Sequence, residues 1–109
     1  MNKYRNKKVI IDGIEFESIK EGNRYSELKL LERAKEITDL KLQVPFELLP
    51  NYEINGKKRR GIKYVADFCY IDIRTGKYVV EDVKGFKTKE YSLKKKMFEQ
   101  KYGIELREI

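Results

Sequence analysis

The sequence predicts a single α/β domain, in which a helix, three strands, a second helix and a last strand follow a short N-terminal β-hairpin. The chain of 109 residues is long enough for one hydrophobic core and short for two, so residues 1–109 are interpreted as one domain. Apolar residues recur at helical spacing in two segments, and runs rich in Val, Ile, Tyr and Phe lie between them. A strand on each side of the second helix indicates a crossover with a parallel pair, so the sheet should be mixed.

The N-terminal part of the chain predicts a hairpin and then a helix. Residues 9–16, VIIDGIEF, place Asp12-Gly13 between two short apolar runs, which is typical of a tight β-turn. A helix is expected over residues 18–36, although Gly22 weakens its first turns. Its apolar stripe includes Tyr25, Leu28 and Leu31.

The rest of the chain supplies the strands and the second helix. Residues 37–49 predict a strand in which Pro45 indicates an edge or a bulge. Residues 51–61, NYEINGKKRRG, read as a turn-rich basic connection. Further elements are expected as strands over 62–73 and 77–84, a helix over 89–102 capped by Gly103, and a short strand over 104–109.

Composition excludes several classes of chemistry. The chain has no histidine, which removes Ser/His and Cys/His triads, histidine general bases and histidine-bound zinc. Its single cysteine, Cys69, excludes an internal disulfide and a cysteine-based zinc site. No apolar run approaches the roughly 20 residues of a membrane span, and MNKYRNKK lacks the apolar stretch of a signal peptide. We therefore expect no membrane partner, and catalysis would rest on carboxylates, lysines, tyrosines or a hard metal ion.

Positive charge points to a polyanionic partner. The formal net charge is +7, and Lys and Arg gather in the N-terminal KYRNKK, in GKKRRGIK at 56–63 and in KGFKTKEYSLKKK at 84–96. The alternative is that these segments are only solvated faces of a lysine-rich protein.

Two strands carry acids where hydrophobic side chains are expected. Strand alternation places Asp82 and Lys84 on one face and Glu81 on the other, while Asp67 shares a face with Cys69 on the preceding strand. If the strands pair so that Asp67 and Asp82 point the same way, two carboxylates meet in an apolar sheet, which is costly without compensation. A divalent cation would remove that repulsion, and oxygen ligands suit Mg²⁺ or Mn²⁺.

These residues resemble the motif of the PD-(D/E)XK nuclease superfamily. Asp67 is followed, after fourteen residues, by Asp82-Val83-Lys84, and the predicted order of elements resembles the α-β-β-β-α-β restriction-endonuclease-like core. FESIKEGNRYSEL resembles the Ser-x-x-Glu signature of resolvase-like members, which maps a further metal-site acid onto Glu21. Together with LQVPFELLP, YVADFCY and VEDVKG, the pattern looks like a short phage- and prophage-encoded nuclease-like family. Ala66 departs from the motif's proline, and Asp82 from its commoner glutamate.

The resemblance implies a Mg²⁺- or Mn²⁺-dependent DNA endonuclease, acting in phage recombination or packaging on branched or end DNA within the bacterial host cytoplasm. Asp67, Asp82, the Val83 carbonyl and Glu21 would hold the metal, and Lys84 would position or activate the attacking water. The expected partner is DNA, and a homodimer is kept beside a monomer. The expected nucleic-acid contacts are Lys57, Lys58, Arg59, Arg60, Lys87, Lys94 and Lys95.

Each site residue also has a structural interpretation. Ser18-x-x-Glu21 is equally a helix capping box. Glu81 could be the site acid in place of Asp82, and Asp67 with Lys84 could form a plain salt bridge. For the whole protein, the alternative is a non-catalytic nucleic-acid- or protein-binding phage module built on the nuclease fold.

Overall fold

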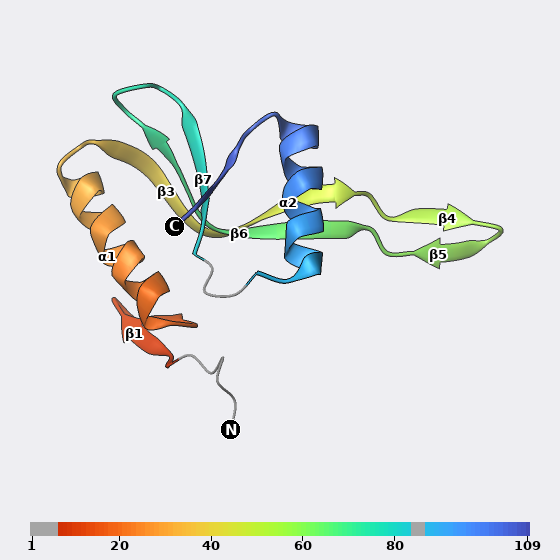
Figure 1. The fold of residues 1–109 in the computed structure, drawn as a ribbon, viewed down its shortest axis with the longest axis horizontal. Coiled ribbons are helices and arrows are strands. Elements are labelled where there is room, and N and C mark those ends of the chain that lie inside the picture. Colours follow the sequence, from red (N-terminus) through yellow and green to blue (C-terminus); the bar gives the residue numbers. More distant parts are fainter. Residues whose placement is uncertain (1–6, 84–86) are drawn as a thin grey trace.

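The computed structural model describes residues 7–83 and 87–109, and it contains eight strands and two helices within those ranges (Figure 1). The predicted α/β class, with two helices, a mixed sheet and an N-terminal hairpin, is confirmed. The elements are β1 (Val9–Ile11), β2 (Ile14–Phe16), α1 (Ile19–Arg33), β3 (Ile37–Leu49), β4 (Tyr52–Ile54), β5 (Lys57–Arg59), β6 (Ile62–Asp72), β7 (Tyr78–Asp82), α2 (Lys89–Tyr102) and β8 (Leu106–Glu108).

The central sheet has the strand order β3-β6-β7-β8. β3 pairs antiparallel with β6, and β6 pairs antiparallel with β7, whereas β7 and β8 are parallel because α2 carries the chain from one to the other. Two apolar clusters of buried residues flank the sheet. The α1-side core includes Tyr25, Leu28, Phe68, Tyr70 and Val79. The α2-side core includes Tyr64, Ala66, Cys69, Val80, Tyr91 and Phe98.

The N-terminal hairpin packs against the start of α1. Asp12 and Gly13 have φ angles of 54° and 75°, as a two-residue type I′ turn requires. A Cβ added to Gly22 would lie 2.7 Å from the Cγ2 atom of Val9. Gly22 is therefore required for the approach of the hairpin, whatever it costs in helix propensity.

Helix α1 begins as predicted and ends earlier than predicted. The Ser18 side chain accepts a hydrogen bond from the Glu21 N–H at 3.1 Å, which caps the helix. The helix stops at Arg33, because Lys35 turns to a φ of 61°. The N–H groups of Lys35 and Glu36 then donate to carbonyl groups of the last helical turn. Helix α2 has the predicted bounds, and Gly103 adopts the left-handed cap conformation, with a φ of 66°.

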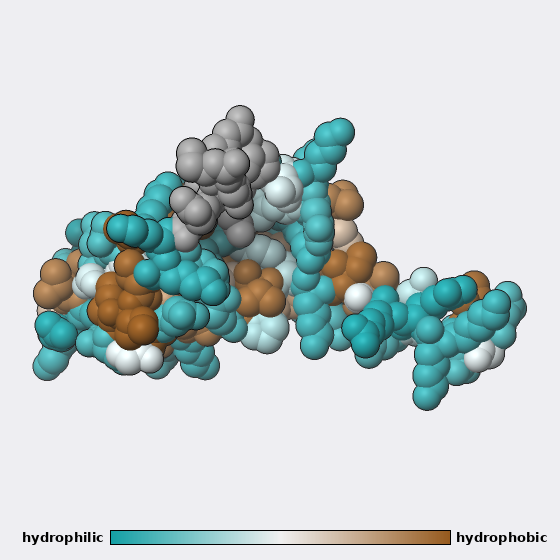
Figure 2. All heavy atoms as spheres, turned by 90° about the horizontal axis from the view of Figure 1, so that it is seen from below, coloured by the Kyte–Doolittle hydropathy of each residue, from teal (hydrophilic) through white to brown (hydrophobic). Residues whose placement is uncertain are grey.

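The segment predicted as a basic connection is instead a second short hairpin. β4 and β5 pair through a turn at Asn55 and Gly56, whose φ angles are 50° and 73°. Within the described part of the chain, β4 and β5 contact each other and no other helix or strand. Residues 51–60, called the arm below, project from the end of the sheet as a narrow and mostly hydrophilic extension (Figures 1 and 2).

The two legs of the arm leave the sheet in close contact. A Cβ on Gly61 would lie 1.9 Å from the carbonyl oxygen of Leu49, so this position admits glycine alone without a backbone shift. The Gly61 N–H also donates to the Asn51 side chain at 2.8 Å.

Among the described residues, no helix has both the length and the apolar character that a membrane crossing requires.

Candidate functional site

The alternation of side chains between the two faces of the sheet is interrupted in β6 at Asp67. Ala66 belongs to the α2-side core and Phe68 to the α1-side core, although residues two apart on a regular strand share a face. The simple alternation on which the shared face of Asp67 and Cys69 was predicted is therefore interrupted at Asp67. The partner strand shows the same switch, because Leu42 packs on the α1 side and Val44 on the α2 side.

Gln43 produces this local twist. Its φ is 52°, a left-handed conformation inside a strand that costs a residue with a Cβ about 1–2 kcal/mol. The pairs Leu42–Phe68 and Val44–Ala66 are formed on either side, while Gln43 and Asp67 are not paired through the ladder. Backbone strain of this kind clusters at functional sites, where the surrounding structure maintains it.

The Gln43 amide joins two carboxylates from different elements. Its Nε2 lies 3.2 Å from Asp67 Oδ1 and 3.5 Å from Glu21 Oε1. Glu21 is buried at the start of α1, with 8% of its surface exposed, as its place on the apolar stripe predicts. The first helix, the first long strand and the second long strand thus each contribute one polar group to a single point.

Asp82 and Val83 reach Asp67 from the end of β7. The last registered pair is Phe68 with Glu81, and continuing that register by one residue brings Asp67 level with Asp82. The Val83 N–H donates to Asp67 Oδ2 at 2.8 Å. This side-chain bond extends the contact between β6 and β7 past the end of the backbone ladder.

The neighbouring acids Glu81 and Asp82 lie on opposite faces of the sheet, as alternation predicts. Asp82 is fully buried on the α2 side, where its Oδ2 accepts a 2.7 Å hydrogen bond from the Tyr64 hydroxyl. Glu81 is fully buried on the α1 side, where Arg24 donates to both of its oxygens at 2.9 and 2.6 Å. The Tyr70 hydroxyl donates to Glu81 as well. Glu81 is thus a structural ion-pair partner, which weakens its case as the site acid.

Two tyrosines that the sequence analysis did not assign to the site lie beside the aspartates. Burial, the hydrogen bond to Asp82 and the negative charges of Asp82 and Asp67 raise the pKa of Tyr64 far above its usual range. Burial also raises the pKa of Tyr91, which donates to Glu108 at 2.8 Å and lies in the field of both aspartates. Both hydroxyls therefore stay protonated at ordinary pH and act as neutral donors.

Comparison with known proteins identifies the family. A family model described as "Protein of unknown function (DUF1064)" matches residues 1–108. The chain belongs to the DUF1064 family. No curated protein and no solved structure matches it.

The basic residues assigned to nucleic-acid contact in this DUF1064 chain fall into two groups. Those of the arm, Lys57 to Arg60, are exposed. Those before and within α2 are in ion pairs: Lys87 and Lys95 lie 3.1 and 3.3 Å from Glu108, and Lys94 lies 3.2 Å from Glu90. The arm is therefore the better-supported contact surface.

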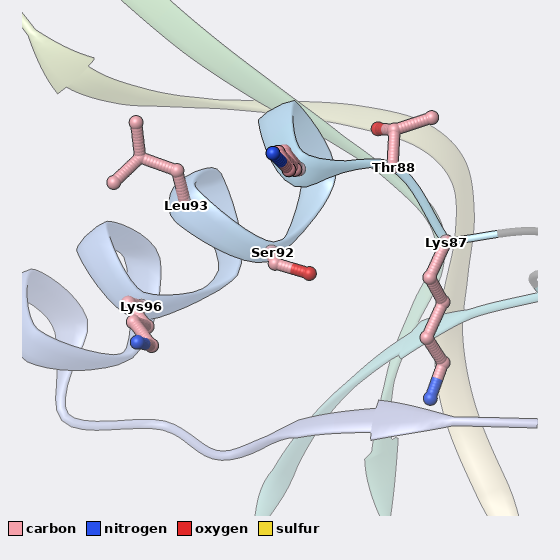
Figure 3. A pocket seen from close by; sticks show the side chains of 6 residues that line it. Lys87, Thr88, Ser92, Leu93 and Lys96 are labelled. Carbon is pink, nitrogen blue, oxygen red and sulfur yellow. The ribbon is translucent and has the colours of Figure 1, made fainter.

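Helix α2 also presents lysines that the sequence analysis did not single out. Figure 3 shows a hollow at its first turns, where Lys87 extends toward β8 while Lys96 lies farther along the helix. The hollow is lined by Lys87, Thr88, Lys89, Ser92, Leu93 and Lys96.

Lys84, the predicted lysine of the motif, lies outside the described residues, and so does the proposed pairing of Asp67 with Lys84.

The oxygen donors of the DUF1064 site have the chemistry of a hard-cation site. In residues 7–83 and 87–109, no group of three or more His, Cys, Asp or Glu side chains is gathered closely enough to hold a metal ion. Mg²⁺, however, is usually bound by one or two carboxylates together with waters and substrate phosphates. Glu21 and Asp67, which share one amide donor, are two such carboxylates, and the Val83 backbone bonds to Asp67 beside them.

The contacts of Glu108 predict that the packing of β8 against α2 is weakened by acid. Hydrogen bonds from Tyr91 and Lys87, with Lys95 close by, lower the pKa of Glu108 from 4.5 to about 2. A carboxyl group with a depressed folded-state pKa stabilises the fold above its ordinary pKa, and the effect is lost as the pH falls toward the folded value. Glu108→Gln should therefore be less stable than the parent near neutral pH, and the difference in urea midpoint should shrink between about pH 4.5 and 2. A difference that stays constant across this window would contradict the assignment.

Proposed function

We propose that this DUF1064 protein is a metal-dependent nuclease that hydrolyses phosphodiester bonds in DNA. The observation that carries the proposal is the convergence of Glu21 and Asp67 on the Gln43 amide, with Asp82 and Val83 beside them. Carboxylates from a helix and a strand, Glu21 and Asp67, meet at the point where the sheet is twisted by a strained residue. Oxygen ligands around a twisted, strained strand indicate a site that binds and acts on a ligand.

The arrangement of the elements supports membership of the PD-(D/E)XK superfamily. Without the two short hairpins, the order α1-β3-β6-β7-α2-β8 is compatible with the α-β-β-β-α-β core that the sequence resembles. Asp67 lies in the second strand of that core, Asp82 at the end of the third, and Glu21 in the first helix. These are the elements on which the resemblance expects the site acids.

In this proposal the protein's own groups orient the carboxylates. Gln43 holds oxygens of Glu21 and Asp67 toward one point, and the Tyr64 hydroxyl fixes one oxygen of Asp82. Mg²⁺ or Mn²⁺ held by Asp67, Asp82, the Val83 carbonyl and Glu21 would supply charge for the scissile phosphate and lower the pKa of a bound water. Lys84 is assigned the positioning of the attacking water.

One feature favours the non-catalytic alternative. A single amide satisfies oxygens of both Glu21 and Asp67, and a backbone N–H satisfies the other oxygen of Asp67. A DNA-binding module would keep the same hydrogen bonds for stability alone. Turnover, and not binding, separates the two functions.

Asp67→Asn should lower metal-dependent cleavage by on the order of a thousandfold, since loss of several kcal/mol of electrostatic stabilisation has that effect on rate. The assay uses end-labelled linear, nicked and four-way-junction DNA with Mg²⁺, with Mn²⁺ and with EDTA. Asp72→Asn is the matched control, because Asp72 also lies in β6 but its side chain accepts a hydrogen bond only from the nearby Arg74 N–H among the bonds described. It should cleave like the parent.

The assay also has outcomes that contradict the proposal. Cleavage that persists in EDTA would exclude a metal-dependent reaction. Equal activity of Asp67→Asn and the parent would remove Asp67 from the site. DNA binding by the parent without cleavage under any metal would favour the binding module.

A further inference from the structure

The arm has two chemically different faces. Its register pairs Tyr52 with Arg59, Glu53 with Lys58 and Ile54 with Lys57. Directly opposed residues of an antiparallel pair share a face, and successive residues alternate. One face, called the Tyr52 face below, therefore carries Tyr52, Ile54, Lys57 and Arg59. The other face carries Glu53 and Lys58, and alternation adds Arg60 to it.

The Tyr52 face has no structural reason to carry apolar groups. Tyr52 and Ile54 are 47% and 51% exposed, and no helix or strand of the described chain packs on the arm. An isolated two-stranded hairpin is marginally stable in water, so a partner that covers these apolar side chains would stabilise the arm. The arm holds four cations against the single acid Glu53, so that partner should be a polyanion.

The distance from the candidate site to the tip of the arm is close to the length of one helical turn of DNA. Ten residues separate Asp67 from Lys57, and an extended chain rising about 3.3 Å per residue spans about 33 Å over that distance. One turn of B-form DNA spans about 34 Å. β5 lies beyond the end of β6 and away from the centre of the sheet, so a duplex laid along β6 would meet the arm (Figure 1).

We propose that the Tyr52 face of the arm enters the major groove of double-stranded DNA about one turn from the phosphate held near Asp67. A two-stranded ribbon fits the B-DNA major groove, which is about 12 Å wide, whereas the A-form groove of duplex RNA is too narrow to admit side chains. Lys57 and Arg59 would contact the phosphates that border the groove, and Ile54 with Tyr52 would contact base edges such as the thymine methyl group. The distance from the cleaved phosphate rests on the proposed nuclease function, whereas the groove contact does not.

Two double variants with the same change of charge test which face binds. Lys57→Ala with Arg59→Ala alters the Tyr52 face, and Lys58→Ala with Arg60→Ala alters the opposite face. Binding of each to a 30-base-pair duplex of random sequence is measured in EDTA over a range of salt concentrations. The first variant should lower the slope of log affinity against log salt by about 1.8, or about 0.9 for each phosphate that the protein no longer neutralises. The second should lower it by less than half as much, and equal reductions would overturn the assignment of the face.

The groove and the distance are tested by chemical protection. Dimethyl sulfate modifies guanine N7 in the major groove, and the parent should protect guanines about ten base pairs from the position of cleavage. Tyr52→Ala with Ile54→Ala should lose that protection, and it should keep the fold because the arm supports no other element. Protection confined to the minor groove, equal affinity for duplex RNA, or no binding of duplex DNA by the parent would each overturn the proposal. If guanine protection depends on the arm but no DNA is cleaved, the nuclease function alone is refuted. If DNA is cleaved and the arm variants change neither protection nor cleavage, the groove contact alone is refuted.

Discussion

Glu81→Ala should lower the free energy of unfolding by about 3–5 kcal/mol, the cost of removing one partner from a buried ion pair. Glu81 is fully buried and receives both donors of the Arg24 fork, and 18% of the Arg24 side chain is exposed. The variant leaves that guanidinium without its carboxylate and the Tyr70 hydroxyl without its acceptor. Urea unfolding followed by circular dichroism measures the loss.

A double variant separates the missing partner from the missing volume. Arg24→Met with Glu81→Leu removes both charges and fills the space with apolar groups, which is often neutral or stabilising for a buried pair. It should recover most of the stability that Glu81→Ala loses. If Glu81→Ala unfolds at nearly the parent's urea concentration, the ion pair does not hold α1 against β7 as the contacts indicate.

Asp82→Asn should behave in the opposite way, with little loss of stability in EDTA and a large loss of metal response and cleavage. Gathering Asp67 and Asp82 for a cation leaves two carboxylates close together in the metal-free protein, and the amide removes one of these charges at nearly the same volume. Its carbonyl can still accept the hydrogen bond that Tyr64 donates. The metal-free variant should therefore be as stable as the parent or more stable.

Thermal melts in EDTA and in Mn²⁺ measure this difference. An ion that binds the folded state alone at a hundred times its dissociation constant stabilises it by about 2.7 kcal/mol, so the parent should gain on that order and Asp82→Asn much less. Cleavage by the variant should fall by on the order of a thousandfold. Asp72→Asn serves again as the control that keeps the metal response. A loss of about 3–5 kcal/mol by Asp82→Asn in EDTA, with no metal response in the parent, would instead identify a buried salt bridge and end the nuclease proposal.

Part of the candidate site can be predicted from short-range patterns in the sequence. The opposite facing of Glu81 and Asp82 follows from strand alternation, and the inward position of Glu21 follows from helical spacing, because both periods are properties of the backbone. Asp67 breaks the alternation, and nothing adjacent to it in the sequence indicates the break. The cause is Gln43, which lies on another strand.

Elements whose ends depend on local chemistry can be predicted from the amino-acid order alone. Asp12-Gly13 specifies its turn, Thr88 and Gly103 cap α2, and residues 37–49 form the predicted strand. The turn and the two caps each depend on groups that lie within a few residues of one another along the chain.

Other features of the site depend on tertiary packing. Gln43 is held in a left-handed conformation and bridges Glu21 to Asp67, and Tyr64 donates to Asp82, because separate elements bring these groups together. The arm is not one of these features, because the Asn55-Gly56 turn that forms it is a local hairpin signal, which the sequence analysis interpreted only as a connection. Local rules act over a few residues, whereas these features require groups distant in sequence to be packed together from both sides of the sheet.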